Sequence, residues 1–208
     1  MRYKIVEDFF ELEHFNILKS LDLKPTNKDQ LSIYHNRVTK NGKIYSECIN
    51  KNILAELDKV YRKKMLEILF ELYPEKVKYF DYSEFHIIET GSHYSYPIHN
   101  DNPEKLLSGV IYISPFENKG TIIYDDKNGK NPKEITWKPN LGFFFSRKEN
   151  ETWHSYEGNK KNNRVALVYN LMTYDIKQIC EIENINYIKF KIKNFLNPYI
   201  YRFFKKLI

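Results

Sequence analysis

The segment YPIHNDNPEKLLSGVIYIS (residues 96–114) places His99 and Asp101 two positions apart, directly before an apolar run that is typical of a strand. In an extended chain, side chains at positions i and i+2 point to the same side, so this imidazole and this carboxylate can converge on one point. Such a pair of ligands suits Fe(II), Mn(II) or Zn(II). A His-x-Asp pair also arises often by chance, and an ordinary loop whose side chains bond to the backbone is the alternative.

A third ligand is expected from a distant strand, because a barrel brings residues of separate strands together at its mouth. His154, in the segment ETWHSYEG, is the natural candidate, and a buried structural histidine is the alternative for this residue. His86 and His93 are rival ligands. We expect His86 on an outer or packing face and His93 in a turn at the mouth.

Ten residues after His154, Arg164 opens a strand-like run within the segment NNRVALVYNLM (residues 162–172). Its alternation predicts one shared face for four side chains: Arg164, Ala166, Val168 and Asn170. A buried arginine needs an anion, and the carboxylate of a bound ligand is one candidate. An ion pair of Arg164 with Glu149 or Glu151 is the alternative.

Polar and aromatic residues flank these candidates and are predicted to contact a substrate. They are His93, Tyr94, Asn100, Lys105, Arg147 and Trp153. For Lys105 a solvated position in a turn is the alternative, and for the aromatic side chains it is packing in the core.

Turn-forming residues divide the chain after Phe80 into short strand-like segments. We expect eight strands, at residues 84–90, 94–101, 107–114, 120–125, 133–138, 142–147, 151–156 and 163–172. Eight short strands that follow a helical segment predict a mainly β fold with flanking α elements. Its core is expected to be a double-stranded β-helix, a cupin-like jelly roll, and the N-terminal helices are expected to buttress one sheet.

The N-terminal part shows helical periodicity. Helices are expected within residues 7–23 and 50–74, the second closed by Pro74, with a strand at 30–39 between them. The chain shows no repeat and no linker, so we expect one domain. Its parts are a helical N-terminal support (1–79), a jelly-roll catalytic core (80–173) and a basic, aromatic C-terminal tail (174–208).

The order of His99, Asp101, His154 and Arg164 over eight strands resembles the Fe(II)/2-oxoglutarate-dependent oxygenase superfamily. The similarity is strongest to its prolyl-4-hydroxylase-like and phytanoyl-CoA-dioxygenase-like members, and it covers residues 80–173. In that superfamily the His-x-Asp pair ends the second barrel strand, the distal histidine lies on the seventh, and a basic residue on the eighth binds the co-substrate.

The resemblance implies that His99, Asp101 and His154 are the catalytic metal ligands and that Arg164 binds 2-oxoglutarate. It implies Fe(II) as the metal, 2-oxoglutarate and O2 as co-substrates, and ascorbate as a further reductant. The implied reaction is hydroxylation of a C–H bond with release of succinate and CO2. Relatives that halogenate lack the carboxylate at the position of Asp101, which favours hydroxylation here.

Two positions depart from the pattern of the superfamily. Many relatives carry a serine two residues after the arginine, where this chain has Ala166. We therefore expect Tyr96 or Tyr112 to supply the missing hydroxyl to the co-substrate. Relatives often have paired glycines where this chain has Gly120 alone, and this difference is expected to concern packing.

The positive charge is concentrated at the C-terminal end. The net charge is +6, but residues 1–183 carry equal numbers of basic and acidic side chains. A neutral body argues against nucleic acid as a partner, because nucleic-acid grooves depend on cationic contacts to phosphates. A small molecule, a sugar or lipid intermediate and a protein side chain all stay open as substrates, and the sequence does not indicate an oligomeric state.

Two separate cysteines, Cys48 and Cys180, fit neither a zinc motif nor a disulfide framework. The N-terminal residues show no signal peptide, and no segment has the apolar length of a membrane span. We therefore expect a cytoplasmic protein. The segment 187–208 interleaves aromatic and aliphatic residues with cations, and Pro198 is expected to interrupt any long helix there. Packing on the body, peripheral contact with an anionic membrane and contact with an acidic partner are the three interpretations.

Two other functions are compatible with the same pattern. A cupin-like metal-dependent isomerase or lyase would use the barrel and the metal without 2-oxoglutarate, and it would have no use for Arg164. A non-catalytic jelly-roll module that binds carbohydrate or lipid would need no metal.

Overall fold

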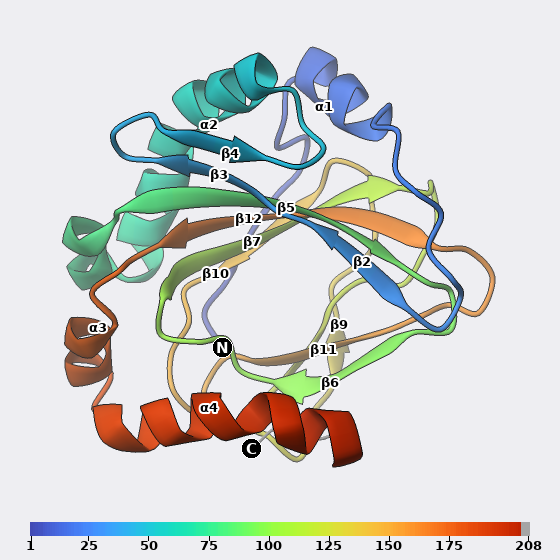
Figure 1. Ribbon diagram of the computed structural model, residues 1–208. Coiled ribbons are helices and arrows are strands. Elements are labelled where there is room, and N and C mark those ends of the chain that lie inside the picture. Colours follow the sequence, from blue (N-terminus) through green and yellow to red (C-terminus); the bar gives the residue numbers. More distant parts are fainter. Residues whose placement is uncertain (205–208) are drawn as a thin grey trace.

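The computed structural model describes residues 1–204, whose strands form two antiparallel sheets (Figure 1). The large sheet has the order β1-β10-β7-β12-β5-β3-β4, with β2 also paired to β5, and the small sheet has the order β6-β11-β8-β9. The strands are β1 (Lys4–Val6), β2 (Leu31–Tyr34), β3 (Asn36–Thr39), β4 (Ile44–Ser46), β5 (Tyr82–Thr90), β6 (Ser95–His99), β7 (Lys105–Ser114), β8 (Ile122–Tyr124), β9 (Lys133–Glu134), β10 (Gly142–Phe145), β11 (Trp153–Glu157) and β12 (Arg164–Met172).

The chain from β5 to β12 passes back and forth between the two sheets. β5, β7, β10 and β12 lie in the large sheet, whereas β6, β8, β9 and β11 lie in the small one. This is the double-stranded β-helix that the sequence predicts, and each of the eight expected strands is present. The expected strand 133–138 is reduced to the two residues of β9. β6 ends at His99, so Asp101 lies just beyond the strand.

The N-terminal part holds more strands than its periodicity predicts. The expected strand 30–39 is divided at His35 into β2 and β3, and both strands pair with β5. β1 and β4 have three residues each, which is too short for alternation to reveal them. The segment 1–79 therefore extends the large sheet as well as covering it.

Helices α1 (Leu12–Lys19) and α2 (Lys51–Leu72) cover one face of the large sheet, called here the outer face (Figure 1). The Asn50 side chain accepts a hydrogen bond from the Asn52 N–H at 2.8 Å and begins α2. The helix ends before Pro74, because the residue that precedes a proline avoids helical geometry. A short 3₁₀ helix, η1 (Pro74–Tyr79), leads into β5.

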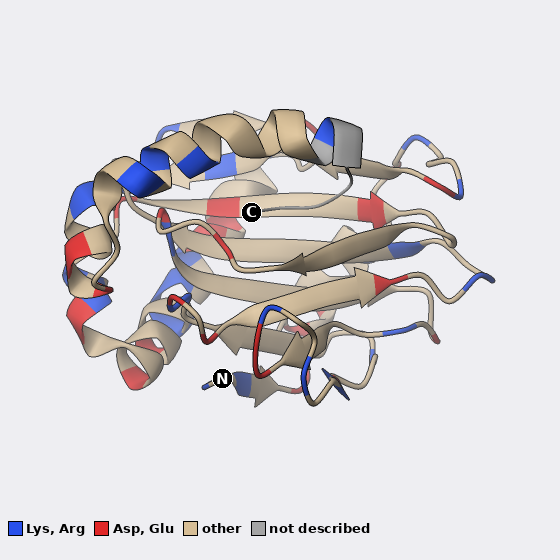
Figure 2. Ribbon diagram, turned by 90° about the horizontal axis from the view of Figure 1, so that it is seen from below, with Lys and Arg blue, Asp and Glu red and all other residues tan. Residues whose placement is uncertain are grey.

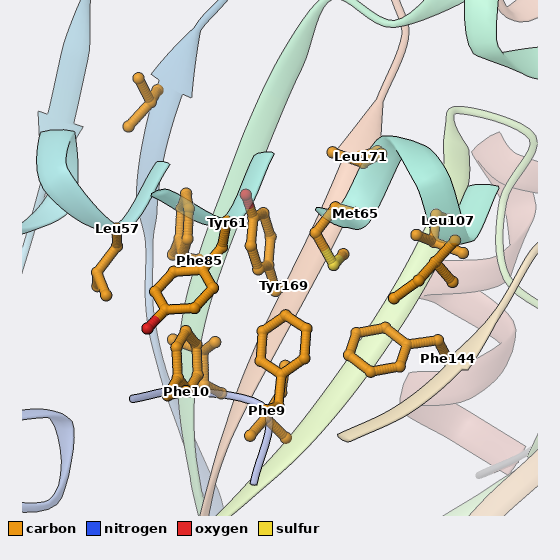
Figure 3. Close-up of a cluster of buried hydrophobic side chains, with 14 of the residues drawn as sticks. Phe9, Phe10, Leu57, Tyr61, Met65, Phe85, Leu107, Phe144, Tyr169 and Leu171 are labelled. Atoms are coloured by element: carbon orange, nitrogen blue, oxygen red, sulfur yellow. The ribbon is translucent and has the colours of Figure 1, made fainter. Parts of the chain in front are cut away.

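Large apolar side chains fill the space between the helices and the outer face (Figure 3). The core contains Phe9, Phe10, Leu57, Tyr61, Met65, Phe85, Leu107, Phe144, Tyr169 and Leu171. On β12 the residues that alternate with Arg164, such as Leu167 and Tyr169, belong to this core and are fully buried. The predicted shared face of β12 therefore lies on the inner side of the large sheet, opposite the helices.

The inner face of the large sheet is less tightly covered than the outer face. Val168 is partly exposed, and so are its cross-strand neighbours Val110 and His86. The prediction of an outer or packing face for His86 is wrong, because the register pairs His86 with Val168 and so turns it inward. Alternation shows which residues share a face, but it does not show which face points to the core.

The C-terminal part contains α3 (Ile176–Ile182) and α4 (Tyr187–Phe204). The expected interruption at Pro198 is wrong, since α4 continues through this residue. Pro198 removes one backbone donor from the helix, but it lies on an exposed stretch where water can satisfy the freed carbonyl. Lys205 and Lys206 of the predicted basic tail lie outside the described residues. No helix within residues 1–204 is both long and apolar enough to span a membrane.

We predict that Leu69→Ala lowers the free energy of unfolding by about 2–5 kcal/mol, because Leu69 of α2 is fully buried in the core. Leu12→Ala is the matched control, since Leu12 lies on α1 and is 73% exposed. Urea unfolding followed by circular dichroism measures both variants. Equal losses in the two variants would contradict the packing of α2 on the large sheet.

Candidate metal centre

His99, Asp101 and His154 converge at the β6 edge of the small sheet. His99 and His154 are cross-strand partners in the β6–β11 pair, and their ring centroids are 4.1 Å apart. One potential ligand atom from each of the three residues lies within 4.8 Å of the other two, and within residues 1–204 this is the only group of its kind. The structure thus brings together the three predicted ligands and leaves His86 and His93 outside the group.

Backbone carbonyls orient both imidazole rings. His99 Nδ1 lies 2.9 Å from the Pro97 carbonyl oxygen, and His154 Nδ1 lies 3.0 Å from that of Thr152. A carbonyl oxygen can only accept a hydrogen bond, so each Nδ1 carries the proton. Nε2 of each ring is then the unprotonated atom, which is the form that binds a metal.

The surroundings keep both histidines neutral. Burial lowers the pKa of His99 to about 3, and the neighbouring His154 adds to this effect. Burial also lowers the pKa of His154. Both rings are therefore neutral at neutral pH, with a proton on Nδ1 alone, so a metal does not have to displace a proton from either Nε2.

Asp101 is held by a donor on each carboxylate oxygen. Lys105 Nζ donates to Oδ1 at 2.8 Å, and Ser108 Oγ donates to Oδ2 at 2.6 Å. Burial alone would raise the pKa of Asp101, but Lys105 and the two histidines outweigh it and hold the pKa well below its usual range. Two imidazole nitrogens and one ionised carboxylate form a donor set that fits Fe(II), with coordination positions left for other ligands.

Arg164 is a buried cation that has no counter-ion within residues 1–204. Its guanidinium carbon lies 3.2 Å from the centroid of the Tyr156 ring, and one of its nitrogens donates to the Lys119 carbonyl at 3.3 Å. Its Nε is buried without a partner, and among the described residues Arg164 forms no ion pair. Burial lowers the pKa of Arg164 to about 10, so it is still charged at neutral pH. An orphaned cation of this kind fits the carboxylate of a bound ligand.

The alternative ion pairs of Arg164 are not formed. Glu149 pairs with Arg147, and Glu151 pairs with Lys148 at 2.5 Å. Both glutamates are therefore engaged by neighbours in the loop between β10 and β11.

The two candidate tyrosines occupy different ends of the site. Tyr112 is the direct cross-strand neighbour of Ala166, the position where relatives carry serine. Its hydroxyl accepts from the Thr121 N–H at 2.9 Å, and its ring stacks on Trp137, over which Arg164 also lies. Tyr96 instead packs edge-on against His99, with centroids 4.6 Å apart. Tyr112 thus shares the end of the site that holds Arg164, and Tyr96 shares the end that holds the metal ligands.

The predicted substrate contacts are dispersed. Asn100 donates to the Lys148 carbonyl at 3.0 Å and joins two loops. Trp153 precedes His154 in β11 and points to the opposite face of the small sheet. His93 Nδ1 lies 3.7 Å from Asp29 Oδ1. The rings of Tyr94 and Tyr96 are stacked, with their centroids 6.5 Å apart. Lys105 binds a carboxylate oxygen of Asp101, and Arg147 binds the Asp101 backbone carbonyl.

Arg147 belongs to a buried ionic network that contacts the backbone of Asp101. Its Nε donates to the Asp101 carbonyl oxygen at 2.8 Å, and its other nitrogens donate to Glu183 and Glu149. Lys76, which is fully buried, donates to Glu183 at 2.7 Å. Burial lowers the pKa of Lys76, and Glu183 opposes this shift. These contacts favour a role for Arg147 in positioning Asp101 over the substrate contact that the sequence suggested.

Sequence reasoning missed several residues that complete the site. Ser108 had a signal, since it is a polar residue within the apolar strand 107–114 and lies seven positions after Asp101. Tyr156 had one as well, because it follows His154 by two residues in an expected strand. Trp137 and Thr121 had none, since their contacts depend on how the loops around β8 and β9 fold.

A polar row leads across the inner face away from Asp101. Paired residues on adjacent strands run in the order Ser108, Asn170, Glu84, Arg37 and Tyr45. Both polar side-chain atoms of Asn170 are buried without a hydrogen-bond partner. The row ends at a cavity of about 290 Å³, lined by His35, Asn36, Arg37, Tyr45, Glu47 and His86. Three strand spacings, or about 14 Å, separate Ser108 from Arg37.

Comparisons with known proteins agree with this architecture. No family model and no curated protein matches the sequence. An oxidoreductase of the 2OG-Fe(II) oxygenase family from Burkholderia pseudomallei matches with a TM-score of 0.56 and 15% identity, over 82% of this chain and 84% of that chain. A prolyl-4-hydroxylase from Pseudomonas putida matches with a TM-score of 0.52 and 14% identity, over 82% and 92% of the two chains.

A third similar structure was solved with a peptide. It is a prolyl hydroxylase from Trichoplax adhaerens in complex with a fragment of the hypoxia inducible factor oxygen degradation domain. Its TM-score is 0.55 and its identity 11%, over 85% of this chain and 86% of that chain. At such identities the similarity establishes the fold. The chain has the fold of 2OG-Fe(II) oxygenases, as its motif order predicts.

We predict that His154→Ala and Asp101→Ala each weaken Fe(II) binding by more than about 100-fold, since loss of a residue that merely supports a ligand already costs 10–100-fold. His93→Ala is the control, because His93 lies outside the group of three. Anaerobic equilibrium dialysis with metal analysis gives the affinities. Wild-type affinity in His154→Ala would exclude this residue as a ligand.

We predict that Glu183→Gln lowers the free energy of unfolding by about 3–5 kcal/mol, because it leaves the buried Lys76 without its counter-charge and Arg147 with Glu149 alone. Glu181→Gln is the matched control on the exposed side of α3. Chemical unfolding of both variants tests the network, and a loss below about 1 kcal/mol in Glu183→Gln would show that it contributes little.

Proposed function

We propose that this protein is an Fe(II)- and 2-oxoglutarate-dependent dioxygenase that hydroxylates a C–H bond. One observation carries the proposal: a buried arginine without a counter-ion accompanies a His-Asp-His triad whose free ligand atoms already converge. A metal alone would explain the triad. The orphaned Arg164 requires an anion as well, and 2-oxoglutarate has a carboxylate at each end.

In this proposal, His99 Nε2, His154 Nε2 and one Asp101 oxygen hold the metal. When bound, Fe(II) and 2-oxoglutarate supply the oxidation, in which O2 gives one oxygen atom to the substrate and one to succinate as CO2 is released. The carbonyls of Pro97 and Thr152 hold the two rings in the ligating tautomer. Lys105 and Ser108 each bind one Asp101 oxygen, so the carboxylate keeps its orientation and its charge.

Arg164 would bind the carboxylate of 2-oxoglutarate that lies far from the metal. Tyr156 and Trp137 lie against its guanidinium and hold it in place. Tyr112 is the candidate for the hydroxyl that replaces the serine missing at Ala166, since it is the cross-strand neighbour of that residue. Tyr96, beside His99, is placed instead to line the metal end of the site.

The substrate would lie over the inner face of the large sheet. Val168, Val110 and Ile88 are partly exposed there, and the polar row continues from Ser108 toward the cavity at His35 and His86. The unpaired amide of Asn170 offers one donor group and one acceptor on this path. This arrangement suits a polar substrate, either a small molecule, a sugar or lipid intermediate, or a protein side chain, with ascorbate as an auxiliary reductant.

The two competing functions differ from the proposal in what Arg164 does. A cupin-like isomerase or lyase would use the triad and leave the guanidinium unpaired. A binding module would not require both imidazoles in the metal-ligating tautomer. The orphaned cation and the oriented rings favour the oxygenase.

We predict that Arg164→Ala weakens 2-oxoglutarate binding at least about tenfold, because it removes a charge-assisted interaction. It should leave Fe(II) affinity unchanged, since Arg164 is not a metal ligand. The weak visible absorption of the anaerobic Fe(II)–2-oxoglutarate complex measures the binding. Arg2→Ala is the matched control on the surface, as Arg2 is exposed.

Two outcomes would count against the proposal. If 2-oxoglutarate binds Arg164→Ala as tightly as wild type, this residue does not hold the co-substrate. If the wild type binds Fe(II) but gives no absorption with 2-oxoglutarate and no succinate, the cupin-like function is favoured.

A further inference from the structure

Helix α4 exposes large apolar side chains on one side. Ile188 is 70% exposed, Phe195 69%, Tyr199 57% and Ile192 56%. Their spacing of four, three and four residues matches the period of an α-helix, so they form a single stripe along the helix. Leu196, 39% exposed, lies at its border. We call Ile188, Ile192, Phe195, Leu196 and Tyr199 the apolar stripe.

The apolar stripe points away from the rest of the molecule. Among the residues of α4 whose side chains the structure describes, the less exposed ones are Tyr187, Phe190, Asn197 and Ile200. At about 100° of rotation per residue, this second set is centred on the opposite side of the helix from the stripe. Packing on the body, one interpretation of the tail, therefore accounts for that side of α4 and not for the stripe.

Cations border the apolar stripe on both sides. On a helix of 3.6 residues per turn, Lys191 and Arg202 lie along one border, and Lys189 and Lys193 lie along the other. α4 carries no acidic residue. In Figure 2, α4 lies at the outer margin of the molecule and carries blue, basic bands and no red, acidic band. The preceding α3 has an acidic residue at Glu181 and another, Glu183, at its C-cap.

An apolar stripe between two rows of cations matches the chemistry of a bilayer surface. The stripe can enter the boundary between head groups and acyl chains, and the flanking cations can then meet lipid phosphates and anionic head groups. Pairing of two α4 helices through the stripe would instead bring the cationic borders of both copies to one interface with no acidic residue on either helix, which is unfavourable. Contiguous exposed apolar residues on a folded protein also indicate an interaction surface.

We propose that α4 is an interfacial helix that attaches this protein to the surface of anionic bilayers through the apolar stripe and its two cationic borders. The helix lies in the plane of the membrane without crossing it. This proposal does not depend on the oxygenase function, because none of the residues that carry it belongs to the metal centre or to the site at Arg164.

Sedimentation of the full chain with vesicles tests the proposal. We expect binding to vesicles that combine phosphatidylcholine with phosphatidylserine, and much weaker binding to phosphatidylcholine alone or at high salt. Ile188→Ser combined with Phe195→Ser should abolish binding to both kinds of vesicle. Lys191→Gln combined with Lys193→Gln should reduce binding to the anionic vesicles by about fivefold per lysine.

Matched controls are available on other helices. Leu12→Ser changes an apolar residue of α1 that is 73% exposed, and Lys63→Gln changes a lysine of α2 whose side chain is 88% exposed. Both should bind vesicles like wild type. All four changes of α4 are at exposed positions, and an unchanged thermal transition confirms that the variants are folded.

Four results would overturn the proposal. Three of them are absence of vesicle binding by the wild type, wild-type binding by the variant that combines Ile188→Ser with Phe195→Ser, and equal loss of binding in the controls. A fourth is a wild-type dimer that the stripe variant converts to a monomer, since the stripe would then be an interface between two copies of the chain.

Discussion

The whole site depends on the register between β6 and β11. His99 and His154 are Cα partners in this antiparallel pair, so their rings meet on one face of the small sheet. A slip of one residue would turn His154 to the opposite face and bring Trp153 in its place. No adjustment of side-chain rotamers could restore the triad after such a slip.

The parts of the fold around this pair preserve its register and complete its chemistry. The alternation of strands between two sheets brings Arg164, on β12, to the inner face opposite the small sheet. The helices fill the outer face with aromatic side chains and hold the large sheet in shape. The inner face is left free for polar groups, and that division of the two faces makes a binding site possible within a protein of this size.

The convergence of the three candidate metal ligands could be predicted from sequence because its signals are local or depend on strand order. His99 and Asp101 are two residues apart at the end of an expected strand, and His154 and Arg164 lie on the seventh and eighth core strands, where the resemblance to the oxygenase superfamily places them. The tautomers of the rings could not be predicted, since they depend on carbonyl positions at Pro97 and Thr152. The predicted face of His86 was wrong because alternation shows which residues share a face of a strand but not which face points to the core.

Contacts between distant segments escaped prediction for a different reason. Arg147 and Glu183 meet across 36 positions, and the intervening chain includes two strands of different sheets. Their pairing requires α3, which is too short for a reliable periodic signal. Pro198 shows the limit of a local rule in the opposite direction, because an exposed helix tolerates a residue that a buried helix would not.

The ionic network gives the C-terminal region two parts of unequal importance for folding. Glu183 is the C-cap of α3 and binds Arg147, whose Nε binds the Asp101 carbonyl. The chain up to Glu183 therefore supports the position of Asp101. The chain beyond it contributes the exposed face of α4. A shortened protein that ends between Glu183 and Tyr187 would therefore keep the candidate metal centre and lose the apolar stripe of α4. One that ends before Ile176 would leave the buried Lys76 without the carboxylate of Glu183 and Arg147 with Glu149 alone.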